Sequence, residues 1–154
     1  MDMLVNLYQL PEKRTSDNYT IRRVLPPDIH RVCGMVKEVF GEGWASEILP
    51  ALYRQPSSCY IAEHAGRVVG FACFDATALG YFGPIGLREE NRGGGLGGAL
   101  LVETLYGMRE AGYGYGIIGW CDDAADFYRK AVGAKPIDHS MPEDTVYQRL
   151  LMFP

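Results

Sequence analysis

Five of the six residues 93–98 are glycines, and this turn lies between a predicted strand and a predicted helix. Main-chain N–H groups at a helix N-terminus are unpaired and carry partial positive charge, so they bind anions well. Glycines let an anion approach these groups because they have no Cβ. Arg92 adds a cationic side chain at the start of the turn. We therefore predict a phosphate-binding turn, in preference to a flexible turn that only reverses the chain.

Two widespread phosphate-binding motifs fit this turn less well. The Walker A motif is excluded because no Gly-Lys-Ser/Thr follows the glycines. The dinucleotide motif G-x-G-x-x-G matches Gly93, Gly95 and Gly98, and Asp122 follows the next predicted strand as its acidic partner. A dinucleotide-binding fold needs further βα units, and too few residues follow Asp122 to supply them. A nicotinamide dinucleotide binder is therefore the weaker alternative.

Hydrophobic periodicity predicts an α/β (α+β) fold with a mixed sheet. A Pro-Pro-Asp sequence at 26–28 opens the first helix, the second covers 44–53, the third follows the glycine turn, and Asp122 or Asp123 caps the last. Pro84 cannot donate to a ladder, so its strand breaks pairing or bulges there. Strands are predicted over residues 19–24, 58–63, 68–74, 80–87, 117–120, 135–137 and 145–152.

Length indicates one domain, which we place at residues 19–154 behind an N-terminal arm and linker over residues 1–18. The apolar part of this arm, residues 4–10, is expected to form a frayed terminus, an added strand or a contact in a homodimer. The start has no basic region before an apolar run and the chain has no apolar run of about 18 residues, so we expect a cytoplasmic protein without a membrane partner. The cysteines are expected to be reduced and buried: Cys33, Cys59, Cys73 and Cys121.

Charge excludes further classes of partner and site. The net charge of −4 gives no general attraction for nucleic acid or anionic lipid, so neither is an expected partner. His30, His64 and His139 show no metal-ligand spacing, so no metal is expected.

Three segments resemble motifs of the GNAT superfamily of acyl-CoA N-acyltransferases. Residues 92–97, Arg-Gly-Gly-Gly-Leu-Gly, resemble its R/Q-x-x-G-x-G/A signature, and Leu87 matches the apolar residue that precedes it. Residues 83–87, Gly-Pro-Ile-Gly-Leu, resemble the G-P-x-x-V strand of one large subgroup. Residues 127–134 resemble the family's F-Y-x-x-x-G-F. The order of elements is similar over residues 19–152.

The resemblance implies a GNAT-type mixed, splayed central sheet flanked by about four helices, and an acetyl-CoA-dependent N-acetyltransferase that needs no metal. The pyrophosphate of coenzyme A (CoA) would lie on the glycine turn. Its pantetheine arm would lie between strand 84–87 and strand 117–120, bonded to main-chain groups. The residues implied to contact CoA are Ile85, Leu87, Arg92, Gly93, Gly94, Gly95, Leu96, Gly97, Gly98 and Asp122.

Three positions depart from the family pattern. Cys121 stands where the family often has an asparagine that helps hold CoA, so Asp122 or water takes that role. Gly133 comes five positions after Tyr128 instead of four, and Ala134 replaces the usual aromatic residue.

The resemblance also implies direct attack of a small-molecule primary amine on the thioester within a ternary complex. Tyr128 is the predicted acid that protonates the leaving sulfur. The amine must first lose a proton, because a lysine-like amine has a pKa of about 10.4. Asp75 is the predicted base because it ends an apolar strand, and Tyr81 is expected to line the acceptor site. Alternative bases are Glu38, Glu42, Glu63 and His64. A non-catalytic acyl-CoA sensor is the main alternative function.

Overall fold

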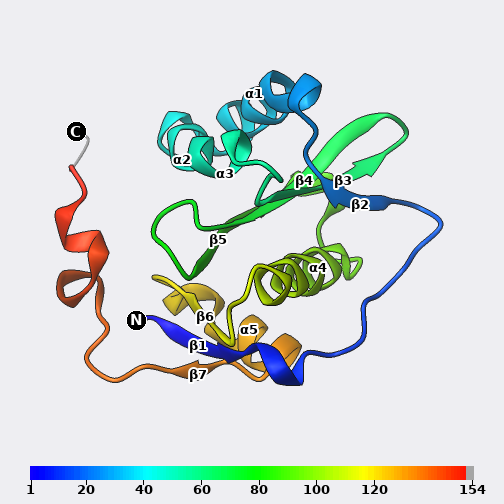
Figure 1. Cartoon of the computed structure of the whole chain (residues 1–154). Coiled ribbons are helices and arrows are strands. Elements are labelled where there is room, and N and C mark those ends of the chain that lie inside the picture. The colour runs from blue at the N-terminus through cyan, green and yellow to red at the C-terminus, as the bar shows by residue number, and fades with distance from the viewer. Residues whose placement is uncertain (152–154) are drawn as a thin grey trace.

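A mixed seven-stranded sheet of order β2-β3-β4-β5-β6-β1-β7 forms the centre of the computed structural model, which describes residues 1–151 (Figure 1). Among the strands of residues 1–151, only β5 and β6 are parallel to each other, and the other neighbours are antiparallel. This confirms the predicted mixed sheet. The strands are β1 (Met3–Asn6), β2 (Thr20–Arg23), β3 (Cys59–His64), β4 (Arg67–Phe74), β5 (Tyr81–Leu87), β6 (Tyr115–Ile118) and β7 (Lys135–Pro136).

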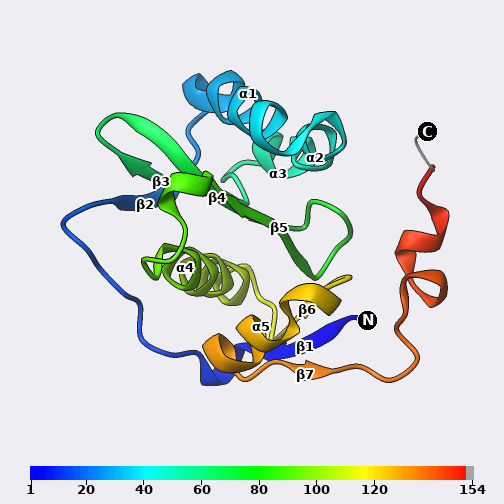
Figure 2. The same cartoon turned by 180° about the vertical axis from the view of Figure 1, so that it is seen from behind.

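Helices cover both faces of the sheet (Figures 1 and 2). On one face lie α1 (Ile29–Phe40), α2 (Glu42–Glu47) and α3 (Leu49–Tyr53), and on the other lie α4 (Leu96–Glu110) and α5 (Ala125–Val132). Successive side chains of β4 point to opposite faces of the sheet. Phe71 and Cys73 pack in the core beneath α1–α3, whereas Ala72 and Phe74 pack in the core beneath α4 and α5. No helix within residues 1–151 is long and apolar enough to cross a membrane.

The N-terminal arm is an added strand. β1 pairs with β6 on one side and with β7 on the other. Met3, Val5 and Leu7 are fully buried in the core beneath α4 and α5. The first residues of the chain thus belong to the same sheet as β5, the strand that precedes the glycine turn.

Three predicted elements differ from the structure. The helix predicted over residues 44–53 is divided into α2 and α3, because Pro50 occupies the first turn of a new helix. The strand predicted over 145–152 was wrong for its described residues, because Val146–Arg149 forms a 3-10 turn that follows another at Pro142–Asp144. Residue 152 lies outside the described part. Neither Asp122 nor Asp123 caps α5, since both lie in a preceding 3-10 turn (Asp122–Ala124).

Candidate active site

β5 and β6 separate soon after they meet. In the described part of the chain, their ladder contains only the pairs Tyr81↔Ile117 and Phe82↔Ile118, although β5 continues beside β4 to Leu87. The β4–β5 register shifts between Ala72 and Phe74, opposite Gly83 and Pro84. This irregularity at Pro84 is the predicted one, and it marks where β5 leaves β6.

Main-chain polar groups of β5 face the opening between the two strands. Arg88 N donates to Val69 O (2.8 Å), beside the pair Leu87↔Gly70. Hydrogen-bonded and non-hydrogen-bonded pairs alternate along an antiparallel ladder, so the N–H and C=O groups of Ile85 and Leu87 point away from β4. They point toward the side from which β6 has diverged.

The glycine turn lies between β5 and α4. Gly93 and Gly95 have left-handed φ values of +84° and +83°, and a Cβ at Gly93, Gly94 or Gly95 would meet no heavy atom within 4 Å. Arg92 Nε donates to Leu87 O (3.3 Å), which holds the guanidinium group beside the turn. The main chain of residues 93–95 therefore borders open space next to the N-terminus of a 15-residue helix.

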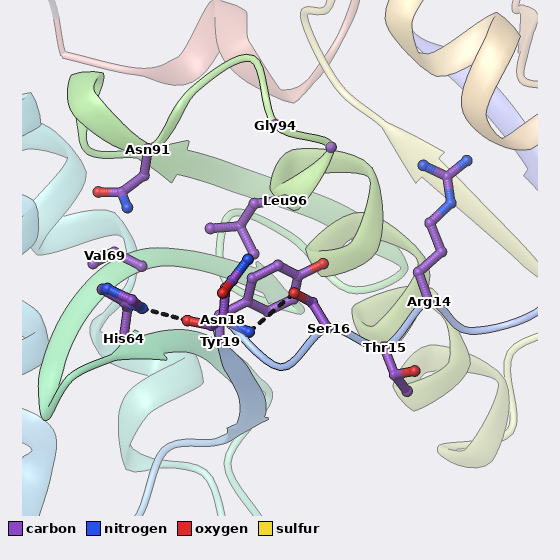
Figure 3. A pocket seen from close by; sticks show the side chains of 11 residues that line it. Arg14, Thr15, Ser16, Asn18, Tyr19, His64, Val69, Asn91, Gly94 and Leu96 are labelled. Atoms are coloured by element: carbon purple, nitrogen blue, oxygen red, sulfur yellow. Dashed lines mark hydrogen bonds between the residues drawn. The ribbon is translucent and has the colours of Figure 1, made fainter.

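Two side chains and a cavity border the turn. Phe127 of α5 lies 3.8 Å from a Cβ placed on Gly97, and Arg14 Nη1 lies 3.4 Å from one placed on Gly98. Arg14 was missed by the sequence analysis because it belongs to the polar stretch interpreted as a linker. A cavity of about 410 Å³ lies beside the turn (Figure 3). Its lining comprises Arg14, Thr15, Ser16, Asn18, Tyr19, His64, Val69, Asn91, Gly94, Gly95 and Leu96.

Tyr128 lies next to the point of separation. Its ring packs edge-on against Phe82, with the ring centroids 6.3 Å apart, and Phe82 is the last β5 residue paired with β6. The side chain is buried, and burial raises the pKa of Tyr128 above the ordinary tyrosine value. Its phenol is therefore protonated at neutral pH and able to donate a proton.

The segment that carries these features also matches a known family. Residues 55–131, half of the chain, match the family described as acetyltransferase (GNAT) domain. The chain belongs to the GNAT acetyltransferase family. The matched residues of this GNAT domain include β3 to β6, the glycine turn and Tyr128, whereas β1, β2 and the C-terminal turns lie outside them.

Solved structures agree with this assignment at the level of the fold. The GCN5-related N-acetyltransferase from Sphaerobacter thermophilus is 24% identical, with a TM-score of 0.70 over 87% of this chain and 47% of that one. An acetyltransferase from Trypanosoma brucei is 20% identical, with a TM-score of 0.61 over 80% of this chain and 97% of that one. The glucosamine N-acetyltransferase region of a fungal multi-domain GH3 beta-N-acetylglucosaminidase is 14% identical, with a TM-score of 0.68 over 87% of this chain and 19% of that one.

The GNAT domain spans about half of the Sphaerobacter chain and about a fifth of the fungal chain. No curated protein matches its sequence significantly.

Asp75 of the GNAT domain is a buried carboxylate with four donor contacts. It accepts hydrogen bonds from Arg54 Nη1 (3.0 Å), Gly80 N (2.7 Å) and the Tyr113 hydroxyl (2.8 and 2.9 Å to its two oxygens). Its side chain is 1% exposed. These contacts close the loop that leads into β5 and leave little room for an incoming amine. The surroundings favour a structural carboxylate, and the base role of Asp75 stays a prediction.

The alternative bases of the GNAT domain pair with other groups. Glu38 lies 3.5 Å from Arg88, Glu42 lies 3.0 Å from Lys37, and Glu63 lies 3.9 Å from Arg22. The His64 ring contacts the carbonyl of Asn18 (Figure 3).

A different carboxylate, Asp2, lies at the separation of β5 and β6. Asp2 is 3% exposed and accepts hydrogen bonds from the Tyr81 hydroxyl (3.2 Å) and from Trp120 N (3.0 Å). No local motif marks Asp2, which reaches this place only because β1 adds to the sheet beside β6.

The residues after β6 face the beginning of the chain. The Cys121 thiol is buried and contacts the carbonyls of Met1 (3.5 Å) and Ile118 (3.6 Å). Burial raises the pKa of Cys121 to about 11, so the thiol stays neutral at physiological pH. Asp122 Oδ2 lies 2.5 Å from the amino nitrogen of Met1. A contact between Asp122 and CoA stays a prediction.

Two other features of the GNAT domain concern cysteines and metals. Cys59 and Cys73 are also buried, Cys33 is partly exposed, and all four thiols are free. Within residues 1–151, no group of three or more His, Cys, Asp or Glu side chains is arranged to hold a metal ion.

Proposed function

We propose that this GNAT protein transfers an acetyl group from acetyl-CoA to a primary amine of a small molecule, by direct attack within a ternary complex. The observation that carries the proposal is the opening between β5 and β6, which exposes main-chain groups along β5 and lies near the glycine turn at the end of that strand. A linear carrier with a diphosphate at one end and amides along its arm is complementary to such an opening.

The residues present fit coenzyme A. The space above residues 93–95, which any Cβ would enter, accommodates a diphosphate on the main chain of residues 93–98. Arg92 supplies a cation beside that diphosphate, and Leu96 begins the helix whose N-terminus attracts it. The outward N–H and C=O groups of Ile85 and Leu87 would bond the amides of the pantetheine arm. Asp122 is proposed as a further contact.

Tyr128 would supply the proton for the leaving group. Acetyl-CoA, when bound, supplies a thioester as the electrophile, and transfer forms the new C–N bond as the C–S bond breaks. The protonated phenol of Tyr128 would give its proton to the departing sulfur, while the amine releases a proton to a base or to water. A thiolate leaves fairly well without protonation because a cysteine-like thiol has a pKa of about 8.5. Protonation by Tyr128 therefore raises the rate of transfer by a factor of about 100 to 1000.

Positioning and polarisation would contribute the rest of the rate enhancement. A main-chain N–H of β5 directed into the opening can donate to the thioester carbonyl as negative charge develops on its oxygen. The rigid sheet holds that donor and Tyr128 in fixed relation.

Binding and transfer assays test the proposal separately. Calorimetric titration of the purified protein with CoA should show saturable binding, and titration with NAD should show none. Incubation with acetyl-CoA and a panel of amines should release thiol in proportion to acetylated product. Binding of CoA without thiol release for any amine would identify a sensor, and binding of NAD without CoA would identify a dinucleotide-binding protein.

Replacing Gly94 with valine should raise the Kd for CoA at least about tenfold. Gly94 lacks the left-handed φ of its neighbours, and its Cβ would meet no heavy atom within 4 Å, so the side chain fits the protein but occupies the space proposed for the diphosphate. Gly43→Val is the matched control, because Gly43 has the same ordinary φ and equally open surroundings. Calorimetry on both variants, with melting curves, measures the effect. Equal affinity in the two variants would remove residue 94 from the CoA site.

The value of kcat should rise continuously from pH 6 to about pH 10 without a decline in that range, because a lysine-like amine has a pKa of about 10.4. The rise follows loss of a proton from the amine. A tyrosine acid is active below its own pKa, and burial raises the pKa of Tyr128 above 10, so this group stays protonated across the range. Initial rates at saturating acetyl-CoA and amine, with stability checked at each pH, measure the profile. A decline centred below pH 9 that is absent from Tyr128→Phe would contradict this assignment.

A further inference from the structure

Tyr147 lies against the strand end at which β6 leaves β5. It belongs to the C-terminal 3-10 turn Val146–Arg149, which both views show near the N-terminus and the loop before β5 (Figures 1 and 2). Its hydroxyl oxygen would be 2.0 Å from a Cβ at Gly119, so only a glycine admits it there. The Tyr147 ring centroid lies 5.4 Å from that of Trp120 and 6.4 Å from that of Tyr81.

Asp2 connects this aromatic cluster to both strands and to the C-terminal segment. Its carboxylate accepts hydrogen bonds from the Tyr81 hydroxyl and from Trp120 N. Its main chain donates to Ser140 Oγ (2.8 Å) and accepts from Ile137 N (2.9 Å). The carboxylate is thus fixed between β5, β6 and the segment that carries Tyr147.

The cluster occupies the face of the sheet opposite Tyr128. Consecutive strand residues point to opposite faces, and Phe82 packs against Tyr128 on the side of α4 and α5. Tyr81 therefore points to the other face, where its hydroxyl meets Asp2. An amine on that face would reach the opening between β5 and β6 from the side opposite the proposed acid.

The electrostatics of the cluster favour a cation. Burial and the negative charges of Asp2 and Glu47 raise the pKa of Tyr147, and burial and Asp2 raise that of Tyr81. Both carboxylates repel an anion. The faces of tyrosine and tryptophan rings attract ammonium groups, most strongly where water is excluded.

Resting on the proposed function, we propose that Tyr81, Trp120 and Tyr147 around Asp2 form the acceptor subsite, and that it takes a protonated primary amine with no carboxylate on the neighbouring carbon. Asp2 and Tyr147 lie outside the family-matched residues 55–131, so this chain supplies them from its own two terminal segments. The ammonium group binds here as a cation and releases one proton to a base or to water before its nitrogen attacks the thioester carbon.

Two matched pairs of amines test the ligand class. Phenethylamine and phenylalanine, like n-butylamine and norvaline, differ only by a carboxylate beside the amine, and all four carry a protonated amino group at pH 7. Equilibrium binding is measured by titration into protein saturated with CoA, and transfer is measured by thiol release from acetyl-CoA. Each amine should bind at least about tenfold more tightly than its amino acid, because the carboxylate approaches Asp2 and Glu47.

Three variants test the residues. Tyr147→Leu should weaken binding of both amines about tenfold, whereas Tyr147→Phe, which keeps the aromatic face, should change it less than about threefold. Asp2→Asn should reduce the preference for each amine over its amino acid about tenfold. All three should bind CoA like the unchanged protein. A merely structural role would alter folding and CoA affinity without altering that preference, and the Tyr147 pair decides the matter if Asp2→Asn fails to fold.

The outcomes separate the two proposals. Normal CoA binding, together with unchanged amine affinity in Tyr147→Leu and an unchanged amine preference in Asp2→Asn, overturns the acceptor subsite and leaves the proposed function standing. Equal binding of amines and amino acids by the unchanged protein, or binding of neither, overturns the ligand class. Absence of CoA binding by the unchanged protein overturns the proposed function and the subsite together.

Discussion

Replacing Tyr128 with phenylalanine should lower kcat about 100-fold, and at most about 1000-fold, with little change in CoA affinity. The variant keeps the ring that packs against Phe82 and Phe127 and removes only the hydroxyl. Because the leaving thiol has a modest pKa, loss of the acid slows departure of the sulfur without abolishing it. Initial rates at saturating acetyl-CoA and amine measure kcat, and calorimetry measures the Kd for CoA.

Tyr113→Phe is a suitable control for that experiment. Tyr113 also bears a hydroxyl with a raised pKa, but this hydroxyl donates to Asp75 in the loop before β5. Its loss should lower stability and leave kcat within about threefold of the unchanged protein. A Tyr128→Phe protein with unchanged kcat would remove Tyr128 from the mechanism and leave it as a core residue.

Replacing Asp75 with asparagine should lower the free energy of unfolding by about 2 kcal/mol, because the charge that Arg54 and Tyr113 contact is lost. Asparagine tolerates the left-handed φ of 54° at this position, so the backbone itself adds little to the effect. The folded fraction should keep kcat within about threefold. Urea denaturation measures stability, and initial rates corrected for folded protein measure turnover.

This pair of measurements decides the role of Asp75. A general base would give the reverse pattern, with kcat reduced by a factor of 100 or more and a nearly unchanged urea midpoint. In that event the loop-closing contacts would be secondary, and Asp75 would return to the mechanism as the predicted base.

The parts of the site that depend on backbone chemistry could be predicted from the sequence. Glycine and proline restrict the main chain wherever they stand, so the turn at residues 93–98 and the irregularity at Pro84 were visible without coordinates.

Of the proposed acceptor subsite, Tyr81 was predicted from the sequence, whereas Asp2 and Tyr147 were not, because distant segments bring them there. Asp2 reaches the separation of β5 and β6 because β1 pairs with β6. Tyr147 reaches it through a 3-10 turn, in a segment that was predicted to be a strand. Asp75 shows a different limit of local reasoning. Its position at a strand end suggested a reactive carboxylate, whereas the donors that occupy it, Arg54 and Tyr113, are far away in the sequence.

Hydrogen bonding through the main chain of β5 does not depend on which side chains the strand carries. Positions 85 and 87 can therefore exchange one apolar residue for another while their outward N–H and C=O groups keep the same directions. The proposed binding of CoA by these main-chain groups therefore tolerates substitution of the strand's side chains. The residues that would surround the acceptor remain free to diversify. A protein that binds its acyl donor through the main chain can change its acceptor by substituting single side chains, without altering the donor site.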